Sequence, residues 1–125
     1  MPAVLIAEDN MINQQMLKAM LDHEPLELVF ANNGQQAIDA IAQQDFDLVL
    51  MDVRMPVMDG LAATRHIRSM DNPKANVPII ALTADATAEV RQACEDVGIS
   101  DYMTKPLDLM KLQELVHHYT GITSP

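Results

Sequence analysis

The chain of 125 residues contains a single cysteine, Cys94, and no long hydrophobic run. One cysteine excludes an intramolecular disulfide and is typical of a reducing compartment. The apolar stretches fall far short of the roughly 20 residues that a membrane-spanning helix needs. No signal peptide precedes the first predicted strand. We therefore expect a cytoplasmic chain with no membrane segment of its own.

Basic residues are also scarce, because eight lysines and arginines stand against 18 aspartates and glutamates, a formal net charge of −10. Proteins that bind nucleic acid present a basic surface, so we expect no direct nucleic-acid binding. Since 49% of the residues are hydrophobic, the chain is not a disordered acidic tail. Repeats, low-complexity segments and linkers are absent from the sequence, which indicates one domain over 1–121 and a tail over 122–125.

Short apolar runs alternate with helical patterns from end to end. Runs of this kind are typical of buried parallel strands. The predicted strands are 3–7, 26–31, 46–51, 77–82 and 99–103. A strand–helix unit that occurs five times with short connections predicts an α/β fold, one parallel sheet covered by helices on both faces.

The first predicted helix spans 11–23 and places Ile12, Met16 and Met20 on one apolar face. We expect Met16 and Met20 at core positions, together with Met51 and Met103. The other helices are predicted after Gly34, after Gly60, over 86–97 and around an apolar stripe that includes Leu112, Leu115, Val116 and Tyr119.

Polar residues stand at the ends of four predicted strands. They are Glu8 and Asp9, Asp52, Thr83, and Lys105. Because the carboxyl ends of parallel strands meet at one edge, where open α/β sheets bind ligands, these side chains should converge. The sequence therefore predicts a site for a divalent metal and a phosphoryl group.

Asp52 is the carboxylate placed to accept the phosphoryl group as an acyl phosphate. Mg²⁺ prefers one or two carboxylates plus water and phosphate oxygens, so Asp9 and Asp52 fit as direct ligands and Glu8 through water; Mn²⁺ is an alternative. Without a cation, each carboxylate pair would cost roughly 3 kcal/mol at about 5 Å. Thr83 and Lys105 would cover the remaining phosphoryl oxygens.

Each of these residues has a simpler explanation when taken alone. Asp9 or Asn10 would cap the first helix, Thr83 would cap the fourth, and Lys105 would belong to an ordinary turn. Only Asp52 favours the functional interpretation by itself. The placement of all of them at one sheet edge makes coincidence a poor explanation.

Four segments resemble those of the response-regulator receiver domain, the phosphoacceptor module of two-component signalling. They are VLIAEDN (4–10), MDVRMPVMDG (51–60), IALTA (80–84) and DYMTKP (101–106). Together they span nearly the whole chain in the family's order. The resemblance implies a flavodoxin-like three-layer fold with strand order 2-1-3-4-5.

The resemblance also assigns roles to matching positions. It implies that Asp52 is the phosphoacceptor, that Glu8 and Asp9 are the acidic pair at the metal, and that the backbone carbonyl of Arg54 is a further metal ligand. Lys105 would hold the phosphoryl group. These assignments agree with the chemistry expected from the residues themselves.

A conformational switch is implied by the same resemblance. Thr83 would be the switch hydroxyl and Tyr102 the switch aromatic residue, while the small Ala84 would leave the site open to a donor histidine. The bond before Pro106 is expected to be cis. Phosphorylation would then change the surface formed by the fourth helix, the fifth strand and the last helix.

The run DNMINQQ (9–15) resembles receivers of hybrid sensor histidine kinases and phosphorelays. It implies a histidine kinase or a histidine phosphotransfer domain as partner. The chain is then either free-standing or a cytoplasmic part of a longer, membrane-anchored hybrid kinase, and the sequence leaves both open. We expect a monomer or a weak dimer.

Arg54 lies two residues after Asp52, and Asp85 lies two residues after Thr83. Both should flank the phosphoryl group, where a pair between them would restrict attacking water and act as a hydrolysis gate. The alternative is two separately solvated side chains, since exposed ion pairs contribute only about 0–1 kcal/mol.

Two other functions share parts of the pattern. A Mg²⁺-dependent phosphohydrolase has similar carboxylates, but Arg54 occupies a position where a general acid would be useful. A receiver-like module that is never phosphorylated would be expected to lack Asp52 or Lys105. We therefore favour a signalling module that is not an enzyme acting on a separate substrate.

Overall fold

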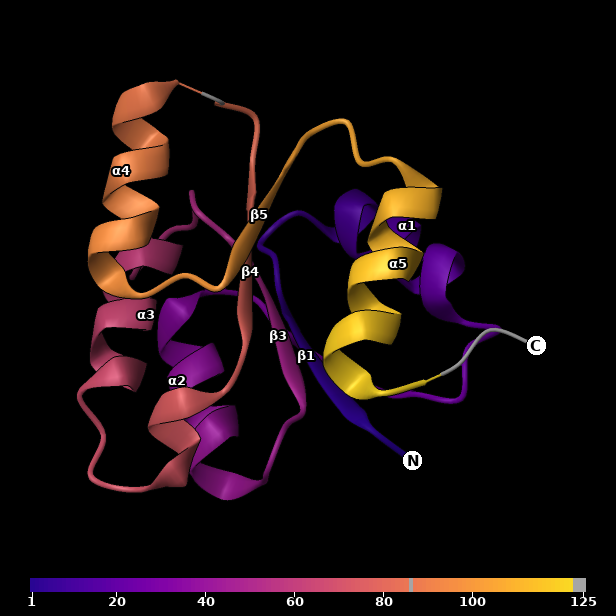
Figure 1. The fold of residues 1–125 in the computed structure, drawn as a ribbon, viewed down its shortest axis with the longest axis horizontal. Coiled ribbons are helices and arrows are strands. Elements are labelled where there is room, and N and C mark those ends of the chain that lie inside the picture. Colours follow the sequence, from indigo (N-terminus) through magenta and orange to yellow (C-terminus); the bar gives the residue numbers. More distant parts are fainter. Residues whose placement is uncertain (86, 123–125) are drawn as a thin grey trace.

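A five-stranded parallel sheet forms the centre of the molecule (Figure 1). The computed structural model describes residues 1–85 and 87–122. The strands are β1 (Ala3–Ala7), β2 (Glu27–Ala31), β3 (Leu48–Asp52), β4 (Ile79–Thr83) and β5 (Asp101–Thr104). Their order in the sheet is β2-β1-β3-β4-β5, with every pair parallel. The flavodoxin-like topology predicted from the sequence is confirmed.

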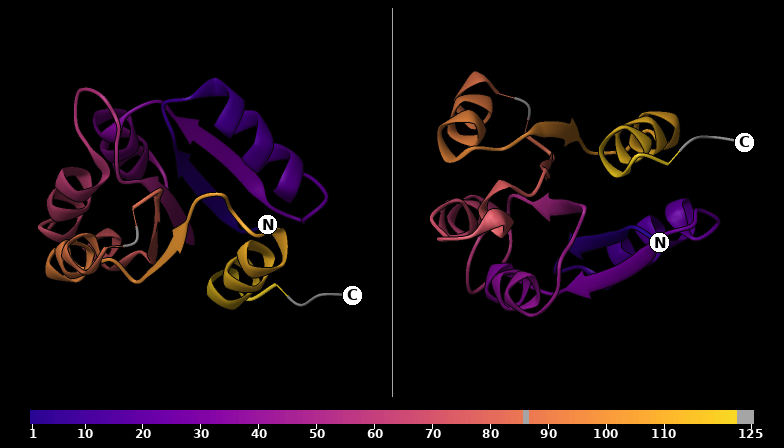
Figure 2. Two further views of the ribbon diagram at one scale, coloured as in Figure 1. Left: turned by 90° about the horizontal axis from the view of Figure 1, so that it is seen from above. Right: turned by 60° about the horizontal axis from the view of Figure 1, so that its bottom comes forward.

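Helices cover both faces of this sheet. They are α1 (Met11–Leu21), α2 (Gly34–Gln43), α3 (Gly60–Arg68), α4 (Ala88–Val97) and α5 (Leu109–Thr120), with a short 3₁₀ helix, η1 (Pro73–Asn76). Figures 1 and 2 show α1 and α5 on one side of the sheet and α2, α3 and α4 on the other. In the described ranges, no helix combines the length and the apolar character needed to cross a membrane.

The three central strands, β1, β3 and β4, are buried along their whole length. Alternate side chains of each strand enter opposite layers of the core, as the pleat requires. Ile6 and Leu50 pack with Leu17 of α1, whereas Leu5 and Val49 pack on the side of α2 and α3. Burial on both faces explains why these strands appear in the sequence as continuous apolar runs.

β1 has the predicted bounds, whereas β3, β4 and β5 are shifted toward the carboxyl end relative to the predicted ranges. The prediction ended β3 at Met51 and β4 at Leu82, but Asp52 pairs with Leu82, and Thr83 pairs with Thr104 of β5. Phe46, Val77 and Ile99, near the predicted starts of these three strands, pack against the core but do not belong to the strand pairing. Two candidate site residues are therefore held by the sheet itself and not by a loop.

The predicted apolar face of α1 is wrong. Ile12 and Met16 are 75% and 44% exposed, while Leu17 and Leu21 are buried against the sheet. Met16 and Leu17 each have an apolar residue four positions on, Met20 and Leu21, so helical spacing alone does not select the buried face. Of the methionines expected in the core, Met51 and Met103 are buried and Met20 is half-buried.

Several predicted boundaries also change. α1 ends at Leu21, before the predicted 23. The cap of α4 is Thr87, whose hydroxyl accepts from the Val90 amide, so Thr83 does not cap that helix. η1 begins at Pro73, where the sequence predicted no helix. The predicted first residue of the fourth helix, 86, and the tail residues 123–125 lie outside the described residues.

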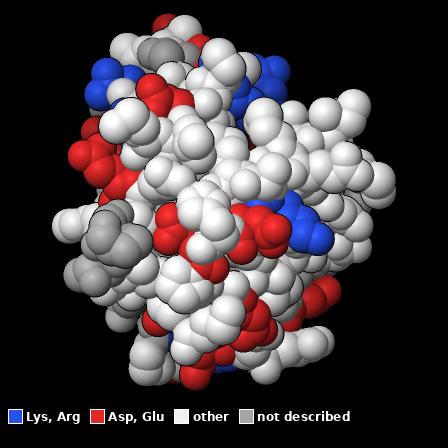
Figure 3. Space-filling view, turned by 90° about the vertical axis from the view of Figure 1, so that its right-hand side faces the viewer, with Lys and Arg blue, Asp and Glu red and all other residues white. Residues whose placement is uncertain are grey.

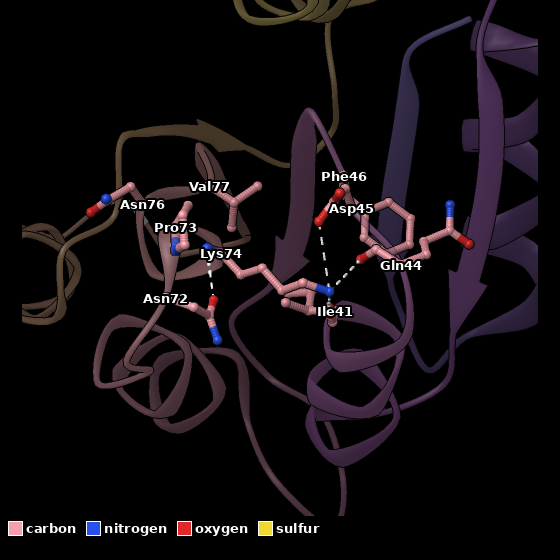
Figure 4. Close-up of a pocket in the computed structure, with 9 residues that line it drawn as sticks. All are labelled: Ile41, Gln44, Asp45, Phe46, Asn72, Pro73, Lys74, Asn76 and Val77. Atoms are coloured by element: carbon pink, nitrogen blue, oxygen red, sulfur yellow. Dashed lines mark hydrogen bonds and ion pairs between the residues drawn. The ribbon is translucent and has the colours of Figure 1, made fainter.

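A lysine ties the opposite, lower edge of the sheet together. Figure 4 shows Lys74 of η1 extending across a pocket toward the end of α2. Its ammonium donates to the carbonyls of Ile41 (2.6 Å) and Gln44 (3.3 Å) and lies 3.7 Å from a carboxylate oxygen of Asp45. A cation at the C-terminus of a helix offsets the negative end of its dipole. This edge is thus fastened by groups that take no part in the site described next.

Candidate functional site

The polar residues predicted to converge do so at the carboxyl edge of the central strands. Glu8, Asp52 and Thr83 are buried, and Asp9 is exposed. One carboxylate oxygen from each of Glu8, Asp9 and Asp52 lies within 4.8 Å of the others. Three carboxylates so close together repel one another, so the arrangement requires cations around it.

Asp52 is fixed by its neighbours on both sides. Its Oδ1 accepts the Arg54 amide at 3.1 Å, and its Oδ2 accepts the Lys105 ammonium at 2.9 Å. Gly60 lies so close behind that a Cβ there would stand 2.1 Å from the Asp52 carbonyl oxygen. Only glycine fits this approach, which brings the loop 53–59 back beside the carboxylate.

Lys105 reaches the carboxylates from the end of β5. The Lys105–Pro106 peptide bond is cis, as the resemblance implied. The ammonium contacts Asp52 and also lies 3.4 Å from Oε1 of Glu8. Burial alone would lower the pKa of Lys105, but the hydrogen bond and charge of Asp52, with those of Glu8, raise it above its ordinary value. The lysine is therefore held fully charged between two acids.

Glu8 is the acid whose surroundings most favour a nearby cation. Its Oε2 is buried and has no hydrogen-bond partner among the described residues. Burial, followed by the proximity of Asp52, raises the pKa of Glu8 to about 7, against the opposing effects of Asn13 and Lys105. An orphaned oxygen beside a cluster of hard oxygen donors fits a divalent cation such as Mg²⁺.

Thr83 and its neighbours form the rim of the site at the end of β4. The Thr83 hydroxyl accepts from the Asp85 amide at 3.0 Å and donates to the Asp85 carbonyl at 3.2 Å. Ala84 is exposed beside it. Both hydrogen bonds of the Thr83 hydroxyl are thus local bonds within its own loop.

Arg54 and Asp85 meet across the mouth of the site. Their closest charged atoms, Nη2 and Oδ2, are 3.9 Å apart, with 82% and 34% of the side chains exposed. Hydrogen bonds from Thr87, and to a smaller extent the charge of Arg54, hold the pKa of Asp85 below its ordinary value. The contact considered from the sequence is present, at a distance that favours a loose pair.

Tyr102 is half-buried beside α4 and has a partner that the sequence did not indicate. The guanidinium of Arg91 lies over its ring, 4.8 Å from the centroid. Arg91 belongs to α4, and Tyr102 to β5. This cation–π contact joins the predicted switch residue to the helix expected to respond to it.

Two carboxamides near Glu8 were also missed as site residues. The side-chain amide of Asn13 donates to Oε1 of Glu8 at 2.6 Å, and that of Gln14 donates to the Glu8 backbone carbonyl at 2.5 Å. Their only signal in the sequence was the run 9–15, which had indicated a subfamily and not a contact.

A family model for the response regulator receiver domain matches residues 4–117. The chain belongs to this family. It is a receiver domain of two-component signalling, as the sequence segments implied. The match covers all five strands of the sheet except Ala3, the first residue of β1, and most of α5.

The relatives of this receiver include sensor kinases. It is 39% identical over 123 residues to the sensor protein GacS of Pseudomonas syringae pv. syringae, covering 97% of this chain and 14% of that protein. It is 38% identical to histidine kinase 5 of Arabidopsis thaliana, covering 94% of this chain and 16% of that protein. The receiver thus spans about one-seventh of the length of these kinases.

Solved structures agree with the fold. The receiver domain of the sensor histidine kinase PA1611 from Pseudomonas aeruginosa, 39% identical, superposes with a TM-score of 0.88 over 97% of this chain and 98% of that one. That structure holds a magnesium ion in its active-site cleft. The receiver domain of Ssk1 from Saccharomyces cerevisiae, in complex with the histidine phosphotransfer protein Ypd1, is 32% identical with a TM-score of 0.87, over 96% of this chain and 89% of that chain.

Replacing Lys105 by Met should destabilise the metal-free receiver by roughly 1–3 kcal/mol, because Glu8 and Asp52 lose a charged hydrogen-bond donor. Urea unfolding at pH 8 in the presence of a chelator measures the effect. Lys111→Met, which removes an exposed lysine of α5, is the matched control. Equal unfolding midpoints for the two variants would contradict the role given to Lys105.

Proposed function

We propose that this receiver accepts a phosphoryl group from a phosphohistidine onto Asp52, in a reaction that depends on Mg²⁺. The observation that carries the proposal is the position of Asp52, buried between the acidic pair Glu8–Asp9 and the ammonium of Lys105. It is a signalling function and not the turnover of a separate substrate.

The residues around Asp52 suit a bound Mg²⁺ ion. Asp9 and Asp52 would ligate it with the backbone carbonyl of Arg54, and Glu8 would act through water. When bound, the ion neutralises the carboxylates and the phosphoryl oxygens so that two anions can approach. The magnesium in the PA1611 receiver supports this assignment. Mn²⁺, with the same preference for oxygen ligands, should substitute.

The transfer step then uses groups already in place. A carboxylate oxygen of Asp52 attacks phosphorus, the phosphorus–nitrogen bond of the donor breaks, and the imidazole leaves with the electron pair. Lys105 moves its hydrogen bond from Asp52 to a phosphoryl oxygen, and Thr83 turns its hydroxyl from Asp85 to another. Both changes place positive charge or a donor where negative charge accumulates.

Rotation of Thr83 would transmit the phosphorylation of Asp52 to the surface of the molecule. When its hydroxyl leaves the loop, space opens beside β4 into which the Tyr102 ring can turn. The ring would then give up its contact with Arg91 of α4. The surface of α4, β5 and α5 would change as a shift between two populations.

The exposed side chains beside the site suit a helical partner. Ile12 and Met16 of α1 are exposed, and Met16 also lines a cleft of about 440 Å³ that includes Pro106 and Leu107. Figure 3 shows the side of the molecule with α1 and α5, where acidic groups are separated by uncharged surface. An amphipathic helix that carries a phosphohistidine would bury these apolar residues. The complex of the Ssk1 receiver with Ypd1 supports a partner of this kind.

Incubation with acetyl phosphate and Mg²⁺ should add one phosphoryl group to the wild-type chain, seen by intact mass. Asp52→Asn or a chelator should abolish the adduct, because either removes a reactant or the ion. Amide NMR of the phosphorylated sample should show its shifts over α4, β5 and α5.

An adduct that persists in Asp52→Asn would contradict the assignment of the phosphoacceptor. Release of phosphate at a steady rate with many turnovers, and without an observable adduct, would support the hydrolase alternative instead. Acetyl phosphate donates the phosphoryl group without a kinase. The absence of an adduct therefore cannot result from the choice of the wrong partner protein.

Arg54→Asn should shorten the lifetime of the acyl phosphate, because the pair with Asp85 no longer shields phosphorus from water. The expected change is at most about fivefold, because an exposed and loose ion pair is a weak interaction. The measurement is the decay of the phosphorylated mass after removal of acetyl phosphate. The control is Arg65→Asn, which replaces an exposed arginine of α3. Identical decay rates in the two variants would contradict the role of Arg54 as a hydrolysis gate.

A further inference from the structure

Glu8 is held by a residue from α1 that the proposed function does not yet use. The Asn13 side-chain amide donates to Oε1 of Glu8 at 2.6 Å, a short distance for a bond to a carboxylate. The Glu8 Oε1 atom therefore has two donors, Asn13 and Lys105, while Oε2 has none among the described residues. Both protein donors lie on one oxygen, which leaves the other for a ligand.

We propose that Asn13 is a positioning residue for the metal site: its amide holds Oε1 of Glu8 so that Oε2 is presented to the hydrated cation. This inference rests on the proposed function, because it assumes that Glu8 acts toward a bound Mg²⁺. Groups that orient the residues around a metal in this way strongly affect its affinity.

Asn13 is itself fixed by the start of α1. Its backbone amide donates to the Oδ1 of Asn10, the N-cap, at 3.1 Å. The next residue, Gln14, donates to the Glu8 backbone carbonyl and, at 2.8 Å, to the side chain of Asn32 in the loop after β2. One helix turn thus holds both the backbone and the side chain of Glu8, and it does so from a half-buried position.

The chemistry of a carboxamide suits this position. Lys105 also donates to Glu8, but the proposed transfer moves it toward the phosphoryl group, after which Asn13 is the donor that stays. A second ammonium or a guanidinium at position 13 would hold Glu8 equally well but would repel a divalent cation. A neutral donor orients the carboxylate and leaves its charge available to the ion.

The test is a calorimetric titration of the metal-free chain with MgCl₂. Asn13→Leu and Asn13→Ala both remove the donor, and leucine keeps most of the volume next to Met16 and Leu17. We expect the dissociation constant for Mg²⁺ to rise by roughly tenfold in each variant. Gln15→Ala, an exposed carboxamide on the same helix, should leave it unchanged.

A double-mutant cycle separates positioning from a general effect on structure. In a Glu8→Ala background, adding Asn13→Leu should cause no further loss of Mg²⁺ affinity, because the group through which Asn13 acts is gone. A persistent tenfold loss in that background would overturn the inference, as would affinities within twofold of wild type in both single variants. Thermal unfolding in the presence of a chelator identifies any variant that does not fold. If either Asn13→Leu or Asn13→Ala fails to fold, the Mg²⁺ affinity of the other variant tests the role of Asn13.

The outcome is also distinguishable from a failure of the proposed function. If the wild-type chain binds no Mg²⁺ and forms no adduct at Asp52, the proposed function fails first. If the wild-type chain does both and the Asn13 variants bind Mg²⁺ equally well, only the role of Asn13 is wrong.

Discussion

Mutual repulsion among Glu8, Asp9 and Asp52 is the constraint on which the arrangement of this receiver depends. Their carboxylate oxygens lie within 4.8 Å of one another, and each pair costs roughly 3 kcal/mol at about 5 Å in a medium of intermediate dielectric. The fold bears this cost by bringing one ammonium, that of Lys105, between two of the acids. A single lysine does not satisfy three carboxylates, and Oε2 of Glu8 has no hydrogen-bond partner among the described residues.

The rest of the structure keeps this unfavourable group in place. Asp52 is the last ladder residue of β3, Gly60 allows the next loop to return against its backbone, and the cis bond before Pro106 accompanies Lys105 at the end of β5. At the opposite edge of the sheet, two other cations form hydrogen bonds with backbone carbonyls. Lys74 of η1 donates to a carbonyl at the end of α2, and Arg68 of α3 is the second cation. The Arg68 guanidinium donates to the carbonyls of Val77 and Gly98. The hydrogen bonds of these two cations thus lie at one edge of the sheet and the carboxylate cluster at the other.

The fold and the centre of the site could be predicted because both depend on short segments of the sequence. Apolar runs give the strands, and the polar residues that end them must meet at one edge of a parallel sheet. The exposed face of α1 could not be predicted in this way, since Leu17 and Met16 are neighbours that each have an apolar residue four positions on, and only packing on the sheet decides which of them is buried. Contacts of Asn13 with Glu8, and of Arg91 with Tyr102, join separate elements and leave no periodic signal.

In the proposed function, repulsion among the carboxylates favours the binding of a divalent cation and then of a phosphoryl group. A site that is under-neutralised when empty favours a divalent cation, and once the cation is bound, an added phosphoryl group can draw Lys105 and Thr83 from their present partners. Asp9 is exposed and contributes charge without supporting the core, so its loss should affect the ion more than the fold.

The most direct test is thermal unfolding of the wild-type chain and of Asp9→Asn, each with and without Mg²⁺. At ten times the dissociation constant, the ion should stabilise the wild-type chain by about 1.4 kcal/mol and raise its midpoint, while the midpoint of Asp9→Asn should barely move. The same rise in both proteins, or no rise in the wild-type chain, would contradict the account of three carboxylates that await a cation.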